Sequence, residues 1–329
     1  LESRGIKWVR VQLVDYTSTV RFRILPVAYF KKVCETLRPS LLFDLSLLGA
    51  GVSQCEVGTE SDWGRECLYV VDFGSFRACP YAPGHATIMG WFEEKTASPT
   101  GDLAIKLCPR TMLNNIVGEA KLKAGLTFLA GFETQFVLLS PQDQASTERV
   151  VNQAGWGCSR GHRTGSAEES VLEEIAENLL EVGIEVQAIH SGVGQLQYEL
   201  VTGPLTPLEA ADVLVHTRET IYNVANKHGL RATLSPRPST HAHDSSTHLH
   251  LSLHTSKSTS SPRSSAHAVV YAPTLTDTER AFLQTLVEHL PALSAITRTT
   301  STSYDDDRDE AEYASWSSTR KDMPIRVCG

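Results

Sequence analysis

The segment DSSTHLHLSL, residues 244–253, alternates between polar side chains and leucine over its second half. Side chains two positions apart in a β-strand lie on the same face. One face therefore carries Leu249, Leu251 and Leu253, and we expect it to pack on the core. The other face carries His248, His250 and Ser252. It is either exposed to solvent or part of a site that binds metal or phosphate, and the pattern alone leaves both interpretations open.

The length and composition are those of a globular protein. The chain has 329 residues, which suits two domains of roughly 100–200 residues each. A net charge of -8 argues against nucleic acid or an anionic membrane as the main partner. The seven cysteines include no CxxC pair, which indicates reduced thiols and a cytoplasmic location. Because the chain starts at Leu1, we interpret it as a fragment.

Two domains are expected, residues 1–100 and 101–329, with the break near the polar segment 93–102. Alternation over 6–15 and 20–25 predicts a hairpin that opens a small α+β domain. Helical spacing follows from residue 109, and helix-start signals lie at 166, 206 and 276. Strands are predicted at 126–140, 184–191, 196–201, 230–236 and 247–254. The second domain is therefore mixed α/β with a largely antiparallel sheet.

Polar residues on three of these predicted strands form a candidate site. Glu133 and Gln135 share a face of the first strand, and Glu199 lies on another. His248 and His250 come from the opening segment. Strands that converge on one cavity can build a metal or phosphate site, whereas each of these residues alone would more simply be solvated.

Several segments, in this order, resemble motifs of the glutamine synthetase family. GFETQFVLL resembles its first carboxylate strand, G-x-E-x-E-F, and HSGVGQLQYEL resembles H-x-E followed by G-Q-x-E. DSSTHLHLSL is similar to G-S-G-x-H-x-H-x-S, and WSSTRKDMPIRV to W-G-x-E-N-R-x-x-x-x-R. The resemblance implies an N-terminal β-grasp domain and a catalytic domain with a mostly antiparallel sheet flanked by helices. The C-terminal part of that domain is expected to be missing.

The resemblance also implies an activity. Glutamine synthetases join ammonia or another amine to the γ-carboxylate of glutamate through γ-glutamyl phosphate, using ATP and Mg²⁺ or Mn²⁺, in ring-shaped homo-oligomers. The alternative is a degenerate member that acts as a structural or regulatory subunit and still binds nucleotide. An unrelated histidine-rich metal-binding protein does not explain the matching helices.

The roles carried over from the family form three groups. The metal ligands are Glu133, Glu199 and His248. The nucleotide-contacting residues are His250 and Ser252. The substrate and catalytic residues are Asp44, His190, Lys321 and Arg326.

The departures from the family concern the same site. Gln135 and Gly192 stand where the family has glutamate ligands of the second cation, and Lys321 replaces an arginine. Asp244 and Ser246 replace the glycines of G-S-G. Lysine lacks the bidentate fork of arginine, so alignment of phosphate or carboxylate is weakened more than charge. We expect glutamates restored at 135 and 192 to strengthen binding of that cation.

Overall fold

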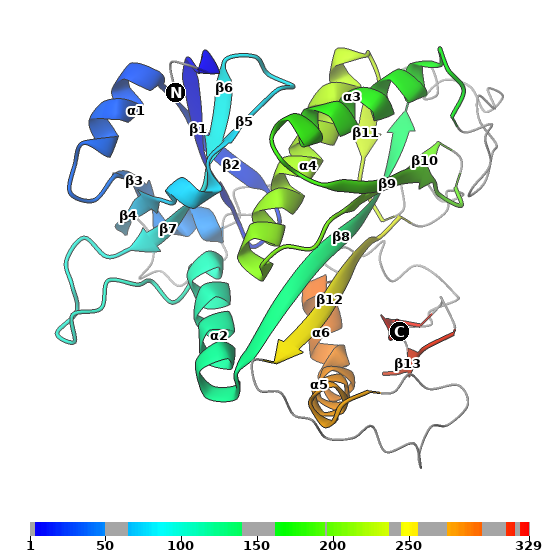
Figure 1. Ribbon diagram of the computed structural model, residues 1–329. Helices are drawn as coiled ribbons and strands as arrows, with labels where there is room; N and C mark the ends of the chain where they lie inside the picture. Colours follow the sequence, from blue (N-terminus) through cyan, green and yellow to red (C-terminus); the bar gives the residue numbers. More distant parts are fainter. Residues whose placement is uncertain are drawn as a thin grey trace. The chain divides into compact units, whose positions relative to one another are not determined.

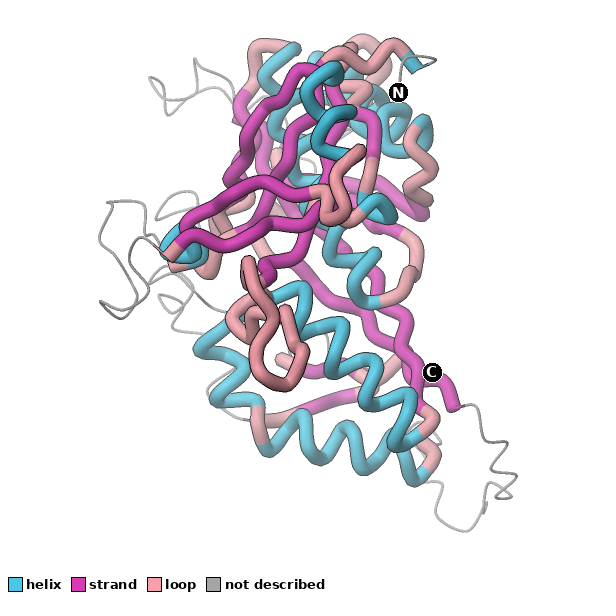
Figure 2. Tube along the Cα trace, turned by 90° about the vertical axis from the view of Figure 1, so that its left-hand side faces the viewer, coloured by secondary structure: helices cyan, strands magenta, loops and turns pink. Residues whose placement is uncertain are grey.

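The computed structural model describes residues 4–49, 65–139, 162–194, 196–236, 245–255, 275–297, 314–319 and 323–328. The chain divides into two compact units, residues 1–254 and 255–329, and each is described by itself. Helices and strands are mixed along the chain, which confirms the predicted α/β class (Figures 1 and 2).

The N-terminal part of the first unit contains two small sheets. In the four-stranded sheet the order is β2 (Val20–Pro26), β1 (Trp8–Val14), β6 (His85–Ile88) and β5 (Arg77–Ala78). β1 and β2 form the predicted hairpin, and β1 pairs with β6 in parallel. The three-stranded sheet contains β3 (Ser40–Asp44), β4 (Glu66–Val71) and β7 (Gly90–Glu93). Helix α1 (Val27–Cys34) follows the hairpin.

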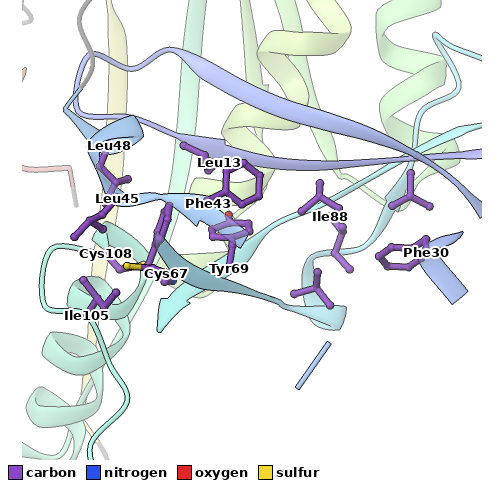
Figure 3. Packing of buried hydrophobic residues seen from close by; sticks show 14 of the residues in the cluster. Leu13, Phe30, Phe43, Leu45, Leu48, Cys67, Tyr69, Ile88, Ile105 and Cys108 are labelled. Atoms are coloured by element: carbon purple, nitrogen blue, oxygen red, sulfur yellow. The ribbon is translucent and has the colours of Figure 1, made fainter. Parts of the chain in front are cut away.

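A hydrophobic core joins these sheets (Figure 3). Val9, Val11 and Leu13 are all buried, as the alternation of the first strand predicts. Tyr69 is buried too, and its hydroxyl donates to the carbonyl oxygen of residue 12 at 2.7 Å. A Cβ at Gly90 would lie 2.4 Å from the Val70 carbonyl oxygen, so only glycine fits at this point of β7.

The second sheet of the first unit carries the candidate site. Its order is β11 (Arg231–Thr233), β8 (Leu126–Leu139), β10 (Gln197–Thr202) and β9 (Val186–Ser191), and β12 (Thr247–Thr255) also pairs with β8. β8 pairs antiparallel with β10 and β11, and β10 with β9. The helices of this part are α2 (Pro109–Ala124), α3 (Ala167–Glu181) and α4 (Pro207–Lys227). α3 and α4 pack together, and α2 and α4 contact β8 (Figure 1).

The helix starts agree with the signals in the sequence. The Ser166 hydroxyl accepts from the Glu169 amide at the start of α3, and Pro207 is the first residue of α4. Thr206 differs, because its hydroxyl donates to the Glu209 carboxylate at 2.6 Å rather than capping the backbone.

One face of the second sheet packs on the helices. Phe136 and Leu138 of β8 and Tyr198 and Leu200 of β10 belong to the buried cluster that includes α3 and α4 residues. The odd-numbered positions between them lie on the opposite face of the sheet. That face carries the polar residues of the candidate site.

The leucine face of β12 differs from the prediction. Leu249 and Leu251 are 57% and 39% exposed, so this face is not part of a core of the first unit. The reason is the position of the strand. β12 pairs with β8, and the cluster beneath the sheet contains no β12 residue.

The second unit contains α5 (Asp277–Glu288), α6 (Leu290–Thr297) and the parallel pair β13 (Trp316–Ser317) and β14 (Ile325–Arg326). Thr276 and Glu279 form a capping box at the predicted start of α5. Within the described part of the chain, no helix is long and apolar enough to cross a membrane.

Candidate metal and substrate site

Three neighbouring strands place polar side chains in one row across the second sheet. His190 of β9 is paired with Glu199 of β10, which is paired with Gln135 of β8. Glu133 lies two residues along β8 and therefore on the same face. The antiparallel register thus brings residues 133 and 135 together with His190 and Glu199, which come from two later strands.

Glu133, His190 and Glu199 are arranged so that they can bind a metal ion. Each offers a ligand atom, and these atoms all lie within 4.8 Å of one another. The His190 Nε2 to Glu199 Oε2 distance is 3.6 Å. Two carboxylates and an imidazole are ordinary ligands of divalent cations, so the donor set fits a metal ion.

The two carboxylates influence each other's protonation. Burial, and then the neighbouring Glu133 carboxylate, together raise the pKa of Glu199 to about 7. Hydrogen bonding to His248 holds the pKa of Glu133 below its usual range. Near neutral pH the pair therefore exchanges a proton readily at Glu199, and a bound cation would favour the doubly ionised form.

The histidines of β12 face Glu133. The Glu133 Oε2 atom lies 3.5 Å from His248 Nδ1 and 3.1 Å from His250 Nε2. On the same face, the Ser252 hydroxyl lies 3.0 Å from His254 Nε2. Imidazole N–H and hydroxyl groups donate hydrogen bonds to phosphate oxygens, so these side chains fit a nucleotide phosphate as well as a metal.

Gln135, which stands where the resemblance leads us to expect a glutamate, is hydrogen-bonded at both ends of its amide. Its Nε2 donates to Glu199 Oε1 at 2.7 Å, and its Oε1 accepts from the Ser246 amide at 2.9 Å. The Ser246 hydroxyl lies 2.7 Å from His248 Nε2. Gln135 thereby links the carboxylate of β10 to the start of β12, a role that its position in the motif did not reveal.

Gly192, the second lost glutamate position, lies against Gln197, a residue that the sequence interpretation missed. A Cβ at residue 192 would lie 2.6 Å from Gln197 Oε1, which accepts from the Gly194 amide at 2.8 Å. Gln197 Nε2 donates to the Ser245 hydroxyl at 2.8 Å, and both residues are buried. A glutamate restored at 192 would therefore have to displace Gln197, and stronger cation binding by such a variant stays a prediction.

The remaining predicted residues belong to other elements than these strands or lie outside the described residues. Asp44 ends β3, and its carboxylate accepts from the Ser46 amide at 2.9 Å, which caps a short 3₁₀ helix. Arg326 belongs to β14 in the second unit. Lys321 and Asp244 lie outside the described residues. Their catalytic roles, and that of Asp44, stay predictions.

Comparison with known proteins identifies the family of the chain. The family model for the glutamine synthetase catalytic domain matches residues 106–329. The chain is 30% identical to protein FluG of Emericella nidulans, over 98% of this chain and 35% of that protein. It is 25% identical to type-1 glutamine synthetase 1 of Dictyostelium discoideum, over 91% of this chain and 61% of that one.

Two further proteins are informative. Glutamate–isopropylamine ligase of a Pseudomonas species is 28% identical over 77% of this chain and 55% of its own length. The crystal structure of a glutamine synthase homologue superposes with a TM-score of 0.78 at 24% identity, over 98% of this chain and 72% of that one. The chain thus spans 35–61% of the three sequence relatives. It is a divergent member of the glutamine synthetase family.

Proposed function

We propose that the protein is an ATP-dependent ligase that joins an amine to the γ-carboxylate of glutamate through γ-glutamyl phosphate. The observation that carries the proposal is the convergence of Glu133, His190 and Glu199 on one sheet face, with His248 and His250 beside them. These are positions at which the family binds metal, substrate and nucleotide phosphates.

Each group has a physical role in such a reaction. A divalent cation, when bound, neutralises phosphate charge and aligns the γ-phosphoryl group with the attacking carboxylate oxygen. Glu133 and Glu199 supply negative charge to hold that cation, and His250 and Ser252 donate hydrogen bonds to nucleotide oxygens. His190 lies in the same row as the carboxylates, at a position that the resemblance assigns to the neighbourhood of the glutamate substrate.

The acceptor in this proposal is ammonia or a small amine. The relatives include proteins named for glutamine and for glutamate–isopropylamine synthesis, so both acceptor types occur among similar chains. The residues that replace the family pattern, at 135 and 192, stand where the resemblance assigns ligands of the cation nearer the glutamate substrate. Substitutions at these two positions are consistent with an acceptor other than ammonia.

The alternative is a nucleotide-binding subunit without efficient turnover. One observation favours it. At residue 135 a glutamine amide donates to Glu199, and beside Gly192 the amide of Gln197 accepts from the Gly194 backbone, so neither expected glutamate position offers a carboxylate. Such a member would keep nucleotide binding and assembly but would align the phosphoryl group poorly.

The test is an incubation with ATP, glutamate, Mg²⁺ or Mn²⁺, and a panel of ammonia, hydroxylamine and alkylamines. We expect ADP and a γ-glutamyl amide, detected by mass spectrometry, and their loss in E133Q. Hydroxylamine would trap the acyl phosphate as a hydroxamate. If no γ-glutamyl product forms, the ligase proposal fails. Stabilisation by Mg-ATP in a thermal shift would then support the alternative.

A further inference from the structure

We propose that the site holds a single divalent cation per chain, bound by Glu133, His190 and Glu199, and that His190 makes it favour Zn²⁺ over Mg²⁺. The inference rests on the proposed function in one respect: it concerns the cation of the same site. The family resemblance implies two cations and places His190 near the substrate. The proposal differs on both points, with one cation and with His190 as one of its ligands.

The orientation of His190 supports a ligand role. Its Nδ1 lies 3.2 Å from the carbonyl oxygen of Ser191, which can only accept a hydrogen bond. Nδ1 must therefore carry the proton in that contact, and Nε2 carries the lone pair. Nε2 faces Glu199 at 3.6 Å. A backbone carbonyl that fixes the tautomer in this way is the usual partner of a metal-binding histidine.

For a second cation, the described residues around Glu199 offer neither a full set of ligands nor free space. Gln135 brings no charge, and its Nε2 donates to Glu199 Oε1, which turns that oxygen toward the amide. At residue 192, the space of a side chain is filled by Gln197. Gln197 is 2% exposed and is bonded to Ser245 as well, so it cannot move aside without losing buried hydrogen bonds.

The donor set then decides the preferred metal. Mg²⁺ requires oxygen ligands in near-octahedral geometry, whereas imidazole suits Zn²⁺. Replacing a carboxylate-rich site by two carboxylates and one imidazole lowers the negative charge around the ion. Affinity for Mg²⁺ depends on that charge, while affinity for Zn²⁺ gains from the nitrogen ligand.

The experiment titrates metal-free protein with Zn²⁺, Mn²⁺ and Mg²⁺ by calorimetry, without ATP or glutamate. We expect one Zn²⁺ per chain at this site. H190N should weaken Zn²⁺ binding by about tenfold or more and leave Mg²⁺ binding nearly unchanged. H228N is the matched control, since His228 follows α4 and contacts Glu174 rather than any residue of this row. It should leave both affinities unchanged.

Spin-echo spectroscopy of bound Mn²⁺ provides a second readout. We expect nitrogen modulation in the parent and in H248N, and its loss in H190N. Two ions per chain, or loss of modulation in H248N but not in H190N, would overturn the proposal in favour of the family arrangement. Because no nucleotide is present, these results are independent of the ligase assay. Metal binding without product formation would leave the single-cation site intact and reject only the ligase.

Discussion

At the scale of single residues, two amides hold the candidate site together. Gln135 and Gln197 fill positions next to Glu199 and Gly192 and are hydrogen-bonded at both ends. An amide carries no charge, so it does not repel the neighbouring carboxylates as a third carboxylate would. The site is thereby satisfied by the protein's own groups, which favours stability without metal over strong binding of two cations.

The contact between Gly192 and Gln197 predicts a sensitive position. G192A should lower the free energy of unfolding by about 1–3 kcal/mol, because the added Cβ overlaps a buried, bonded side chain. G118A is the control. A Cβ at Gly118, inside α2, meets nothing within 4 Å. It should stabilise the helix by about 0.5–1 kcal/mol. Urea unfolding of both variants checks this, and equal stabilities would contradict the packing described here.

The buried His216 predicts a loss of stability in acid. It is 2% exposed, and neither ring nitrogen has a hydrogen-bond partner among the described residues. Burial, and then the charge of Arg77, lowers the pKa of His216 to about 4, from 6.5. The unfolded chain therefore binds a proton between these values that the folded chain does not, so the free energy of unfolding falls as pH drops from about 6.5 to 4.

The variant H216F removes this titration. We expect its unfolding free energy to fall less than that of the parent between pH 7 and 4.5, by on the order of 1–3 kcal/mol. Chemical unfolding across this range measures the difference. Parallel pH profiles for the two proteins would show that His216 does not titrate as its burial implies.

Part of the site could be predicted from single residues. Period-two alternation placed Glu133 with Gln135 and His248 with His250, because it depends only on the geometry of a strand. The partners of Gln197 and Gln135 could not be predicted. They depend on contacts with Ser245 and Ser246, which are distant in the sequence, and no local pattern encodes such contacts.

At the scale of elements, α2 joins the N-terminal sheets to the second sheet. Arg110, in its first turn, donates to Asp72 Oδ2 at 2.5 Å and to the Asp212 carboxylate of α4. Its guanidinium also lies 4.8 Å from the ring centroid of Trp91 in β7. The mostly buried side chain of Arg110 thus links α2 with α4 and β7.

Loss of this arginine should be costly. R110M would leave two carboxylates without their cation, and we expect the free energy of unfolding to fall by about 3–5 kcal/mol. K123M on the same helix is the control, because its ion pair with Glu119 is exposed and should matter by less than about 1 kcal/mol. Thermal unfolding of the two variants compares them. Similar melting temperatures would mean that Arg110 does not link the elements.

The elements show what local patterns can and cannot predict. The starts of α3 and α5 follow from capping residues, which act within one turn. The burial of the β12 leucines did not follow, because alternation says which side chains share a face and not whether anything covers it. Leu249 and Leu251 share a face as predicted, but that face is exposed.

At the scale of the whole molecule, we propose two domains with a boundary near residue 100. Two separate buried clusters support this, one drawn mainly from the N-terminal sheets and one from the second sheet with α3 and α4. In the family, the site lies between the N-terminal domain of one subunit and the catalytic domain of the next. We therefore propose a ring-shaped homo-oligomer, with Asp44 supplied by the neighbouring subunit.

Light scattering at micromolar concentration tests the assembly. We expect a mass that is a multiple of the 36.1 kDa chain. Dilution should lower that mass if the ring is held by weak contacts. A mass of one chain at every concentration would contradict the shared site.

The most direct test of the central claim is anomalous diffraction from crystals grown with Mn²⁺ and a non-hydrolysable ATP analogue. The account predicts one anomalous peak per chain, within bonding distance of Glu133, Glu199 and His190 Nε2, with the nucleotide phosphates on the side of His250. A peak away from these residues, two peaks in the site, or a nucleotide bound elsewhere would contradict it.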